Sequence, residues 1–402
     1  MTSGLGPRPL DGLRILDLTT VVMGPYASSI LADMGADVIK LESPGGDILR
    51  QVGPSRSGEA GGMFLHANRG KRGIVLDLKS EEGRAAALQL IADVDVLFYN
   101  LRPSAMERLG LSYEAVAAQN PAIIYVGAFG FGRDGRYADL PAYDDLIQGL
   151  AAIPALLAEA GDGTPRYVPV NIADRIVGLH AAIAILGAVH FRDRTGLGQR
   201  VDVPMFETMA SMVLADHMAG LSYTPPLDAG GYRRLLTKER RPFRTADGHL
   251  CVVLYTDQHW RRFLEIAGRD DLTSDPRFVN HAARIKHADE IARELATILA
   301  TRSTRAWQDV LGKADIPNAV MHTIESLMQD GHLEDVGFFI HSLHPSEGPV
   351  IEMAPPSRWS LSQPRASRPA PRLGEHTSEI AAEIGNARRA RGGVEHRTIK
   401  SI

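Results

Sequence analysis

Short apolar runs alternate with amphipathic segments along the first third of the chain. Runs rich in Val, Ile and Leu are typical of buried strands. They predict strands at Arg14–Leu18, Asp37–Glu42, Gly73–Leu78, Val94–Leu101 and Ala122–Phe129. Helical periodicity predicts helices at Pro25–Met34 and from the capping residue Ser80 to Ala92. This alternation predicts an α/β fold in which helices cover a mostly parallel sheet.

The pattern changes in the second half of the chain. A helix is expected from Asp174 to about His190, followed by a strand at Arg200–Val203. Residues 224–248 are rich in Pro, Gly and basic side chains and predict a crossover into a second unit. That unit has a strand and then helices expected at Leu250–Tyr255, Gln258–Ala267, His287–Ala300 and Thr304–Ala314. Residues 341–372, rich in Pro and Ser, predict a long extended return before a helix from about Thr377 to Glu383.

Composition narrows the class of protein. At about 150 residues per domain, 402 residues predict two or three domains. An apolar content of 44% excludes a disordered chain, and a net charge of −4 gives no reason to expect nucleic acid as a partner. No stretch approaches the roughly 18 uninterrupted apolar residues of a membrane span, so no membrane partner is expected. The single Cys251 excludes a disulfide framework, and with no signal-peptide pattern we expect a cytoplasmic enzyme.

A glycine-rich segment at Gly130–Gly135 matches the dinucleotide-binding pattern GxGxxG and follows a predicted strand. A dinucleotide site also needs a helix that opens at the glycines and an acidic residue after the next strand. Tyr137, Pro141 and Tyr143 follow instead, without a helical pattern. We therefore interpret the segment as a loop whose backbone approaches another group closely.

Asp174 lies between an apolar run, Tyr167–Ile172, and the long predicted helix. By spacing alone, an aspartate at this position is a helix N-cap. The same geometry also allows a function, because the helix dipole keeps such a carboxylate ionised and an ionised carboxylate can act as a nucleophile.

Basic residues in the first half of the chain gather near the ends of predicted strands. Each is either a solvated surface charge or a contact for a polyanionic ligand: Lys71, Arg72, Arg102, Arg108, Arg133 and Arg136. A later basic run, from Arg233 to Arg241, is interpreted first as a flexible linker. The fourteen histidines show no HExxH or other paired spacing, so no metal site is expected.

Ordered segments along nearly the whole chain carry a family resemblance. They are Pro9–Thr19, Gly24–Ala27, Leu31–Glu42, Gly70–Arg72, Leu76–Lys79, Asn100–Pro103, Glu107–Leu111, Tyr143-Asp144, Ala173-Asp174, Arg194–Gln199, Val201–Val203, Ile316-Pro317 and Leu373–Thr377. Together they resemble the class III coenzyme A transferases. The resemblance implies a Rossmann-like large domain made of residues 1–222 and 331–402, with a smaller α+β domain and its crossover linker inserted at 223–330. It also implies an interlocked homodimer.

The resemblance assigns site residues by position. Asp174 corresponds to the family's catalytic aspartate, which forms aspartyl-CoA thioester and anhydride intermediates, and Tyr143 and Asp144 line the active site. Backbone groups of Val22 and Met23 are implied to contact coenzyme A near its thioester. Its adenine, ribose and phosphates are implied to contact Leu76, Asp77, Leu78, Lys79, Asn100, Leu101, Arg102 and Arg108. Coenzyme A or acyl-CoA is then a substrate, with no tightly bound cofactor and no metal.

The function implied is transfer of coenzyme A from an acyl-CoA to a small carboxylic acid: the acyl group passes to Asp174, and the acceptor carboxylate attacks the anhydride. Attack on the thioester exchanges a carboxylate (pKa about 4) for a more basic thiolate (about 8.5), which is uphill by roughly 6 kcal/mol, so the site must stabilise developing negative charge. An alternative is a 2-methylacyl-CoA racemase or acyl-CoA isomerase that uses Asp174 as acid and base. Tyr143 stands where family racemases have a histidine, which favours a transferase. A third alternative is a non-catalytic CoA-binding scaffold.

Two departures bear on the substrate. Formyl-CoA transferase has a glutamine near the position of Val22 and four glycines where only Gly230 and Gly231 stand here, and both differences argue against formyl-CoA and oxalate. The adjacent basic run suggests that Arg233, Arg234 or Lys238 recognises a second carboxylate on the acceptor. Gly230, Gly231 and Arg233 are therefore candidate substrate-binding residues.

Overall fold

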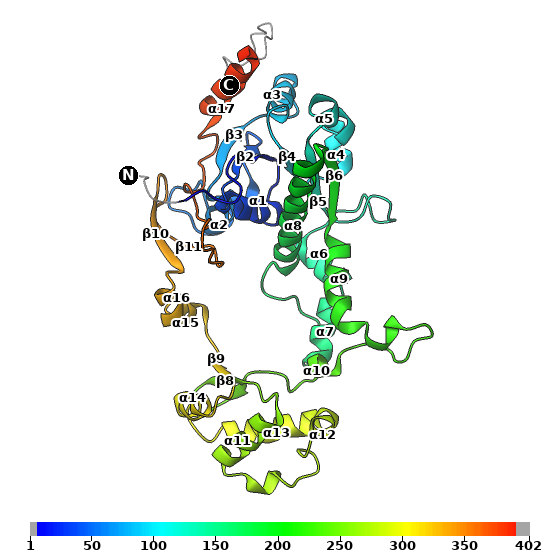
Figure 1. Cartoon of the computed structure of the whole chain (residues 1–402), viewed down its shortest axis with the longest axis vertical. Coiled ribbons are helices and arrows are strands. Elements are labelled where there is room, and N and C mark those ends of the chain that lie inside the picture. Colours follow the sequence, from blue (N-terminus) through cyan, green and yellow to red (C-terminus); the bar gives the residue numbers. More distant parts are fainter. Residues whose placement is uncertain (1–5, 391–402) are drawn as a thin grey trace. The chain divides into compact units, whose positions relative to one another are not determined.

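The chain forms two compact units. The computed structural model describes residues 6–390 (Figure 1). Unit 1 combines the N-terminal part to residue 151, residues 169–211 and the C-terminal part from residue 332. Unit 2 comprises residues 152–168 and 212–331. Residues 391–402, which the predicted C-terminal part includes, lie outside the described residues.

A six-stranded parallel sheet forms the centre of unit 1. Its strand order is β3-β2-β1-β4-β5-β6, and every neighbouring pair is parallel. The strands are β1 (Arg14–Asp17), β2 (Asp37–Glu42), β3 (Arg72–Val75), β4 (Val96–Tyr99), β5 (Ile124–Phe129) and β6 (Gln199–Pro204). The predicted α/β class with a parallel sheet is confirmed. Because β1 pairs with both β2 and β4, the strand order reverses between β1 and β4, and open α/β sheets typically bind ligands at the carboxyl ends of the strands at such a point.

The helices of unit 1 cover the sheet. The long helix α8 (Ile172–Thr195) packs along α1 (Met23–Asp33) and against β5 and β6. Ser80 caps α3 (Glu81–Ile91) by accepting the N–H of Gly83, as the sequence predicted. The remaining helices are η1 (Ile48–Gln51), α2 (Gly62–Asn68), α4 (Pro103–Arg108), α5 (Tyr113–Gln119), α6 (Asp144–Leu150) and α17 (Thr377–Ala390). Helix α9 (Met205–His217) begins in unit 1 and ends in unit 2, and α16 (Gly331–Asp335) begins at the last residue of unit 2.

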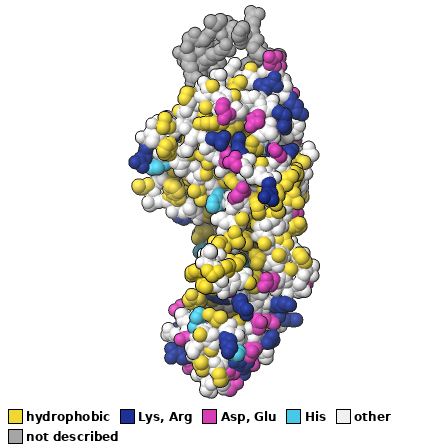
Figure 2. All heavy atoms as spheres, turned by 90° about the vertical axis from the view of Figure 1, so that its right-hand side faces the viewer, with side chains coloured by type: hydrophobic (Ala, Val, Ile, Leu, Met, Phe, Trp, Pro, Cys, Tyr) yellow, Lys and Arg dark blue, Asp and Glu magenta, His cyan; other side chains and the backbone are white. Residues whose placement is uncertain are grey.

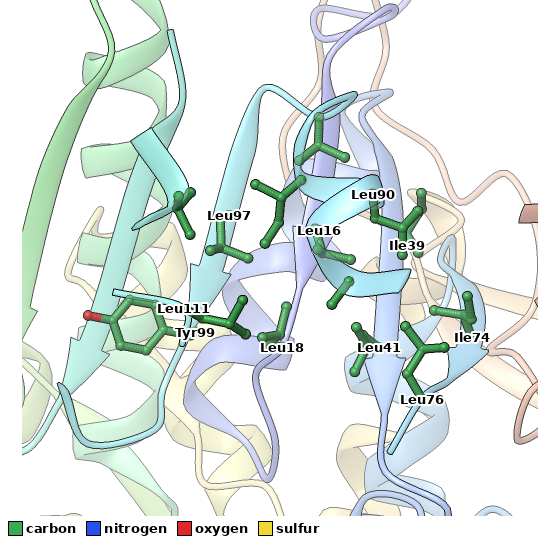
Figure 3. Close-up of a cluster of buried hydrophobic side chains, with 14 of the residues drawn as sticks. Leu16, Leu18, Ile39, Leu41, Ile74, Leu76, Leu90, Leu97, Tyr99 and Leu111 are labelled. Carbon is green, nitrogen blue, oxygen red and sulfur yellow. The ribbon is translucent and has the colours of Figure 1, made fainter. Parts of the chain in front are cut away.

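The main core of unit 1 joins the two ends of the chain. Leu16 is in register with Ile39 on one side and Leu97 on the other, and all three are fully buried. Figure 3 shows these side chains together with Leu90 of α3. Ile380 and Ile384 of α17 belong to the same cluster, so the C-terminal helix completes a core that N-terminal strands begin.

Unit 2 has its own core. Strands β7 (Phe243–Arg244), β8 (His249–Val252) and β9 (Asn318–Val320) form a small antiparallel sheet. Its helices are α7 (Ile153–Ala160), η2 (Ala219–Ser222), α10 (Arg233–Leu236), α11 (Asp257–Ala267), η3 (Asp270–Leu272), α12 (His281–Lys286), α13 (Ala288–Leu299), α14 (Thr304–Lys313) and α15 (Ile324–Leu327). Phe263 stacks on Trp307 with ring centroids 5.9 Å apart, and the Trp307 indole donates to the Leu299 carbonyl at 2.8 Å.

Several predicted elements differ from the structure. The helix expected from Asp174 to about His190 spans Ile172–Thr195, and the strand expected at Leu250–Tyr255 ends at Val252. The extended return contains an antiparallel hairpin, β10 (Phe339–His344) and β11 (Gly348–Met353). Its turn is fixed by Glu347, whose carboxylate accepts hydrogen bonds from Ser55, Arg56 and Ser57, contacts that local sequence does not reveal. The strand expected at Gly73–Leu78 ends at Val75, and the helix expected to end at Glu383 continues to Ala390.

The length and composition of α8 alone would allow it to cross a membrane, with a mean hydropathy of 1.7 over its most apolar window. This evidence is weak, because the core helix of a soluble protein passes the same test. One face of α8 is buried against α1, through Ala173, Val177, Ala181 and Ile185.

Candidate active site

The side chain of Asn100 links the carboxyl ends of β1 and β4. Asn100 follows β4, and its amide accepts the Thr20 N–H at 3.0 Å and donates to the Thr20 carbonyl at 2.8 Å. Open α/β sheets bind ligands in the crevice at this kind of switch point. The loop after β1, residues 19–22, therefore borders the candidate site.

A buried ion pair holds this loop in an unusual conformation. Lys40 and Asp47 pair at 2.9 Å with both side chains fully buried, and the Lys40 ammonium also donates to the Thr19 carbonyl. Asp47 accepts the N–H of Val21, whose φ of 67° is in the left-handed region that β-branched residues avoid. The pair thus fixes the turn that leads into α1 at Met23.

A second buried ion pair, Asp17 with Lys71 at 3.0 Å, lies at the end of β1. Burial is the largest influence on the pKa of Asp17 and raises it, but Lys71, Lys40 and two hydroxyl donors outweigh burial and hold the pKa below its ordinary value. Burial lowers the pKa of Lys71 to about 8, against the attraction of Asp17. Lys71, expected as a possible polyanion contact, is therefore a core residue.

Asp174 is the third residue of α8, and its carboxyl group is half-buried. The predicted N-cap role is wrong, because the helix begins at Ile172 and its N-cap is Asn171. The Asp174 N–H donates to Asp144 Oδ1 at 2.9 Å, and Gln148 donates to the other Asp144 oxygen at 2.6 Å. Burial and then the Asp144 charge raise the pKa of Asp174 to about 7, against the opposing charge of Arg175.

The first turns of α8 lie against the start of α1. A Cβ added at Gly178 would stand 2.7 Å from the Met23 carbonyl oxygen, so only glycine permits this approach. The Arg175 guanidinium stacks on the ring of Tyr26, 4.5 Å from its centroid. The first turns of α8, which carry Asp174, therefore lie against the start of α1, whose first backbone N–H groups have no acceptor within their own helix.

The residues predicted to contact coenzyme A follow β3 and β4 at the same edge of the sheet. Leu76 is buried and its N–H donates to the Glu42 carbonyl, while the Asp77 carboxylate accepts the N–H of Lys79. The Asn100 amide is occupied by Thr20, as described above. Side chains exposed at this edge are Asp77, Lys79, Arg102 and Arg108.

Two further basic candidates are engaged elsewhere. Arg72 starts β3, at the opposite end of the strand, and pairs with Asp37, Glu379 and Glu383. Arg133 pairs with Asp202 at 3.1 Å and donates to the Tyr99 hydroxyl. Neither is available to a polyphosphate.

The glycine-rich loop at Gly130–Gly135 packs against the protein's own chain. A Cβ at Gly130 would stand 2.3 Å from that of Ala142, and Gly132 donates its N–H to Glu207. The expected close backbone approach is confirmed, and the group approached is protein rather than nucleotide.

The remaining predicted site residues are Tyr143, Gly230, Gly231 and Arg233. Tyr143, the N-cap of α6, has an exposed fraction of 69%. Gly230, Gly231 and Arg233 belong to unit 2, and the glycines have φ values of 77° and 87° that favour glycine. Their roles stay predictions. In the described part of the chain no group of three or more His, Cys, Asp or Glu side chains could hold a metal ion.

A doubly wound parallel sheet with a carboxyl group of raised pKa at its switch-point edge defines an α/β enzyme with a candidate nucleophile. The model of CoA-transferase family III matches residues 10–377, and the chain belongs to this family. This confirms the resemblance and makes the protein a CoA-transferase by class.

Relatives and solved structures agree with this assignment. The chain is 34% identical to a succinate–glutarate CoA-transferase of Agrobacterium fabrum, over 94% of this chain and 96% of that protein. It is also 34% identical to a succinyl-CoA:mesaconate CoA-transferase of Haloarcula hispanica, with the same coverage. A CAIB/BAIF family protein from Brucella suis superposes with a TM-score of 0.82 at 31% identity, over 94% of this chain and 100% of that one.

Sequence reasoning missed several residues that shape the site. Lys40 is a charged residue between Ile39 and Leu41 in a predicted buried strand, and this was a usable signal of a buried ion pair. Arg175 directly follows Asp174, but its packing on Tyr26 joins two helices and has no local signature. The same holds for Gln148, which orients Asp144.

Proposed function

We propose that the protein transfers coenzyme A from an acyl-CoA donor to a carboxylic acid, with the Asp174 carboxylate as the nucleophile. The observation that carries the proposal is the half-buried Asp174 beside the start of α1, with its pKa raised to about 7. A carboxylate of this pKa is partly ionised at neutral pH and is a stronger nucleophile than an ordinary one.

The proposed reaction conserves the thioester through covalent intermediates. Asp174 attacks the thioester carbonyl, the C–S bond breaks, and a mixed anhydride and the coenzyme A thiolate form. The thiolate attacks the Asp174 carbonyl of the anhydride, which releases the donor acid and leaves an aspartyl-CoA thioester. The acceptor carboxylate attacks that thioester and forms a second anhydride and the thiolate. This replaces the expected attack on the first anhydride, which would move the donor's acyl group and leave coenzyme A behind. The thiolate then attacks the acceptor's acyl carbon, which yields the new acyl-CoA and restores the Asp174 carboxylate.

Each attack places negative charge on a carbonyl oxygen. The backbone N–H groups of Val22 and Met23, at the positive end of α1, are the proposed donors to that oxygen. Lys79, Arg102 and Arg108, exposed at the same sheet edge, are the proposed contacts for the phosphates. Exclusion of water is required because the anhydride would otherwise hydrolyse.

We propose short dicarboxylic acids as the substrates. The names of the two relatives reported above refer to succinate, glutarate and mesaconate, which all carry two carboxylates. Transfer between two such acids requires the site to recognise a carboxylate that does not react.

A homodimer, interlocked as the family resemblance implies, is part of the proposal. Helices α6 and α8 pack together and carry exposed apolar side chains: Leu146, Leu150, Leu179 and Ile183, the last with an exposed fraction of 64%. Figure 2 shows hydrophobic side chains gathered at the surface on one side of the chain. Large exposed apolar patches are typical of interfaces. Native mass spectrometry should find a dimer, and a monomer of unchanged activity would refute this part.

Asp174→Ala tests the main proposal. Transfer measured by mass spectrometry with acyl-CoAs and carboxylates should fall at least 1000-fold, while coenzyme A still binds. Asp193→Ala, on an exposed position of the same helix, is the matched control and should keep full activity. In the wild type, hydroxylamine should trap an acyl or CoA adduct on Asp174. Retained turnover of Asp174→Ala would refute the proposal, and the trapped adduct would exclude a non-catalytic scaffold.

The pKa of about 7 also suits a general acid and base, and this observation favours a racemase or isomerase as the second candidate. Incubation of a chiral 2-methylacyl-CoA in D₂O separates the two functions. Deuterium at the α-carbon without any carboxylate acceptor indicates proton transfer, whereas a CoA-transferase leaves the α-position unlabelled.

A further inference from the structure

Arg175 is a half-buried arginine without an acidic partner. It directly follows Asp174, and no Asp or Glu oxygen among residues 6–390 lies within 4.0 Å of its guanidinium. Other arginines of unit 1 contrast with it: Arg50, Arg69, Arg72 and Arg192 each pair with a carboxylate at 2.6–2.8 Å. A guanidinium has five donors, and partial burial makes an unpaired one costly.

The side chain of Arg175 is held in place although it lacks an ionic partner. It stacks on Tyr26, 4.5 Å from the ring centroid, and Tyr26 belongs to the first turn of α1. Stacking of a guanidinium on an aromatic face stabilises it and leaves the edge with its N–H donors open. The guanidinium is thus held at the start of α1, on the residue that follows the nucleophile, before any ligand binds.

We propose that Arg175 binds the distal carboxylate of a dicarboxylic acyl group while Asp174 attacks its thioester end. The proposal rests on the function proposed above and names the subsite that such substrates require. A carboxylate accepts two parallel hydrogen bonds from one guanidinium, which gives both charge neutralisation and orientation. An acyl group with a methyl end would instead leave the guanidinium unpaired, so the site selects against monocarboxylic acids.

The experiment compares matched acyl-CoAs in Arg175→Gln, Arg175→Lys and the wild type. Succinyl-CoA and glutaryl-CoA carry the distal carboxylate, and butyryl-CoA is the apolar reference of similar length. Since Arg175 also lowers the pKa of Asp174, rates are measured at pH 8.5, where Asp174 is ionised in every variant. Arg194→Gln, an exposed position in the last turn of the same helix, is the matched control.

In Arg175→Gln, kcat/KM for succinyl-CoA should fall about 100-fold with butyryl-CoA changed less than threefold. Arg175→Lys should recover part of the loss, because lysine keeps the charge but not the paired donors. Tyr26→Leu, which removes the ring that holds the guanidinium, should show the same selectivity with a smaller loss, and it tests the subsite independently if Arg175→Gln is unstable.

Equal losses with both kinds of acyl-CoA would overturn the proposal, as would a wild type that prefers butyryl-CoA. A selective loss in Arg233→Gln but not in Arg175→Gln would also overturn it, and would favour the basic run of unit 2 as the subsite. Absence of any CoA transfer by the wild type would instead refute the proposed function, so the two failures are distinguishable.

Discussion

The Asp144 charge raises the pKa of Asp174, so Asp144→Asn should extend activity to lower pH. Asp144 Oδ1 accepts the Asp174 N–H at 2.9 Å, which keeps the two carboxyl groups near each other. Burial contributes most to the pKa of about 7, and the Asp144 charge is the next cause. An asparagine oxygen can accept the same N–H, so the variant removes a charge and preserves the shape.

The size of the shift follows from Coulomb's law. Like charges about 5 Å apart repel by about 1–3 kcal/mol at effective dielectric constants between those of water and a protein surface. At 1.36 kcal/mol per pH unit, removal of this repulsion in Asp144→Asn lowers the pKa of Asp174 by about one to two units, to about 5–6. At pH 5.5 the variant should therefore retain about tenfold more of its own plateau rate than the wild type does.

The assay is kcat/KM for the acyl-CoA from pH 5 to pH 9, since this parameter reports ionisation in the free enzyme. Asp145→Asn is the matched control: it removes the same charge from the same turn of α6 but from an exposed side chain. Its acid limb should remain near pH 7. The reasoning would be refuted if kcat/KM of Asp144→Asn fell at the same acidic pH as that of the wild type. It would also be refuted if kcat/KM of the wild type fell only near pH 4.

Three other substitutions have expected outcomes that unfolding and rate measurements check. Asp174→Asn should raise the free energy of unfolding by about 2–4 kcal/mol at pH 8 and leave it unchanged at pH 4; an equal change at both pH values in urea titrations would contradict this. Gly178→Ala should lower kcat at least tenfold because the added Cβ separates α8 from α1, whereas Gly187→Ala, with open space around it, should be neutral; equal kcat values would show that the close approach is dispensable. Lys71→Ala should destabilise by about 3–5 kcal/mol by leaving a buried carboxylate unpaired, and a loss no larger than that of the exposed Lys79→Ala would mean that the pair is solvated.

Elements with strong local signals could be predicted from the sequence. The strand at Asp37–Glu42 was predicted with its observed bounds, and α3 begins after its predicted cap, Ser80. The hairpin β10–β11 could not be predicted, because its turn depends on Glu347 binding residues almost 300 positions earlier in the chain. Local periodicity carries no information about such pairings.

The candidate site also combines features that the sequence predicts with features that depend on tertiary contacts. Asp174 could be identified from the family pattern, but its pKa depends on burial and on Asp144, which reaches it from another helix. Charge suggested Lys71 and Arg72 as contacts for a polyanionic ligand, but both form ion pairs with carboxylates distant in the sequence. Such pairs decide whether a cation is available to a ligand. Sequence therefore predicts which residue types are present at the site, and tertiary contacts determine which of them can act.

The raised pKa of Asp174 links the stability of the fold to the proposed chemistry. With an ordinary carboxylate, attack on a thioester is uphill by roughly 6 kcal/mol, judged by the difference between pKa values of about 4 and 8.5. With a pKa of about 7 the difference is about 1.5 units, or about 2 kcal/mol. The remaining free energy is a destabilisation of the folded state by the ionised Asp174 carboxylate. Below the unfolded pKa near 3.8 the carboxyl group is protonated and does not destabilise the fold, and stability is lost as the pH rises through the folded pKa of about 7. Acylation removes the charge and relieves this cost, so the stabilisation expected for Asp174→Asn at pH 8 measures the same free energy that favours anhydride formation.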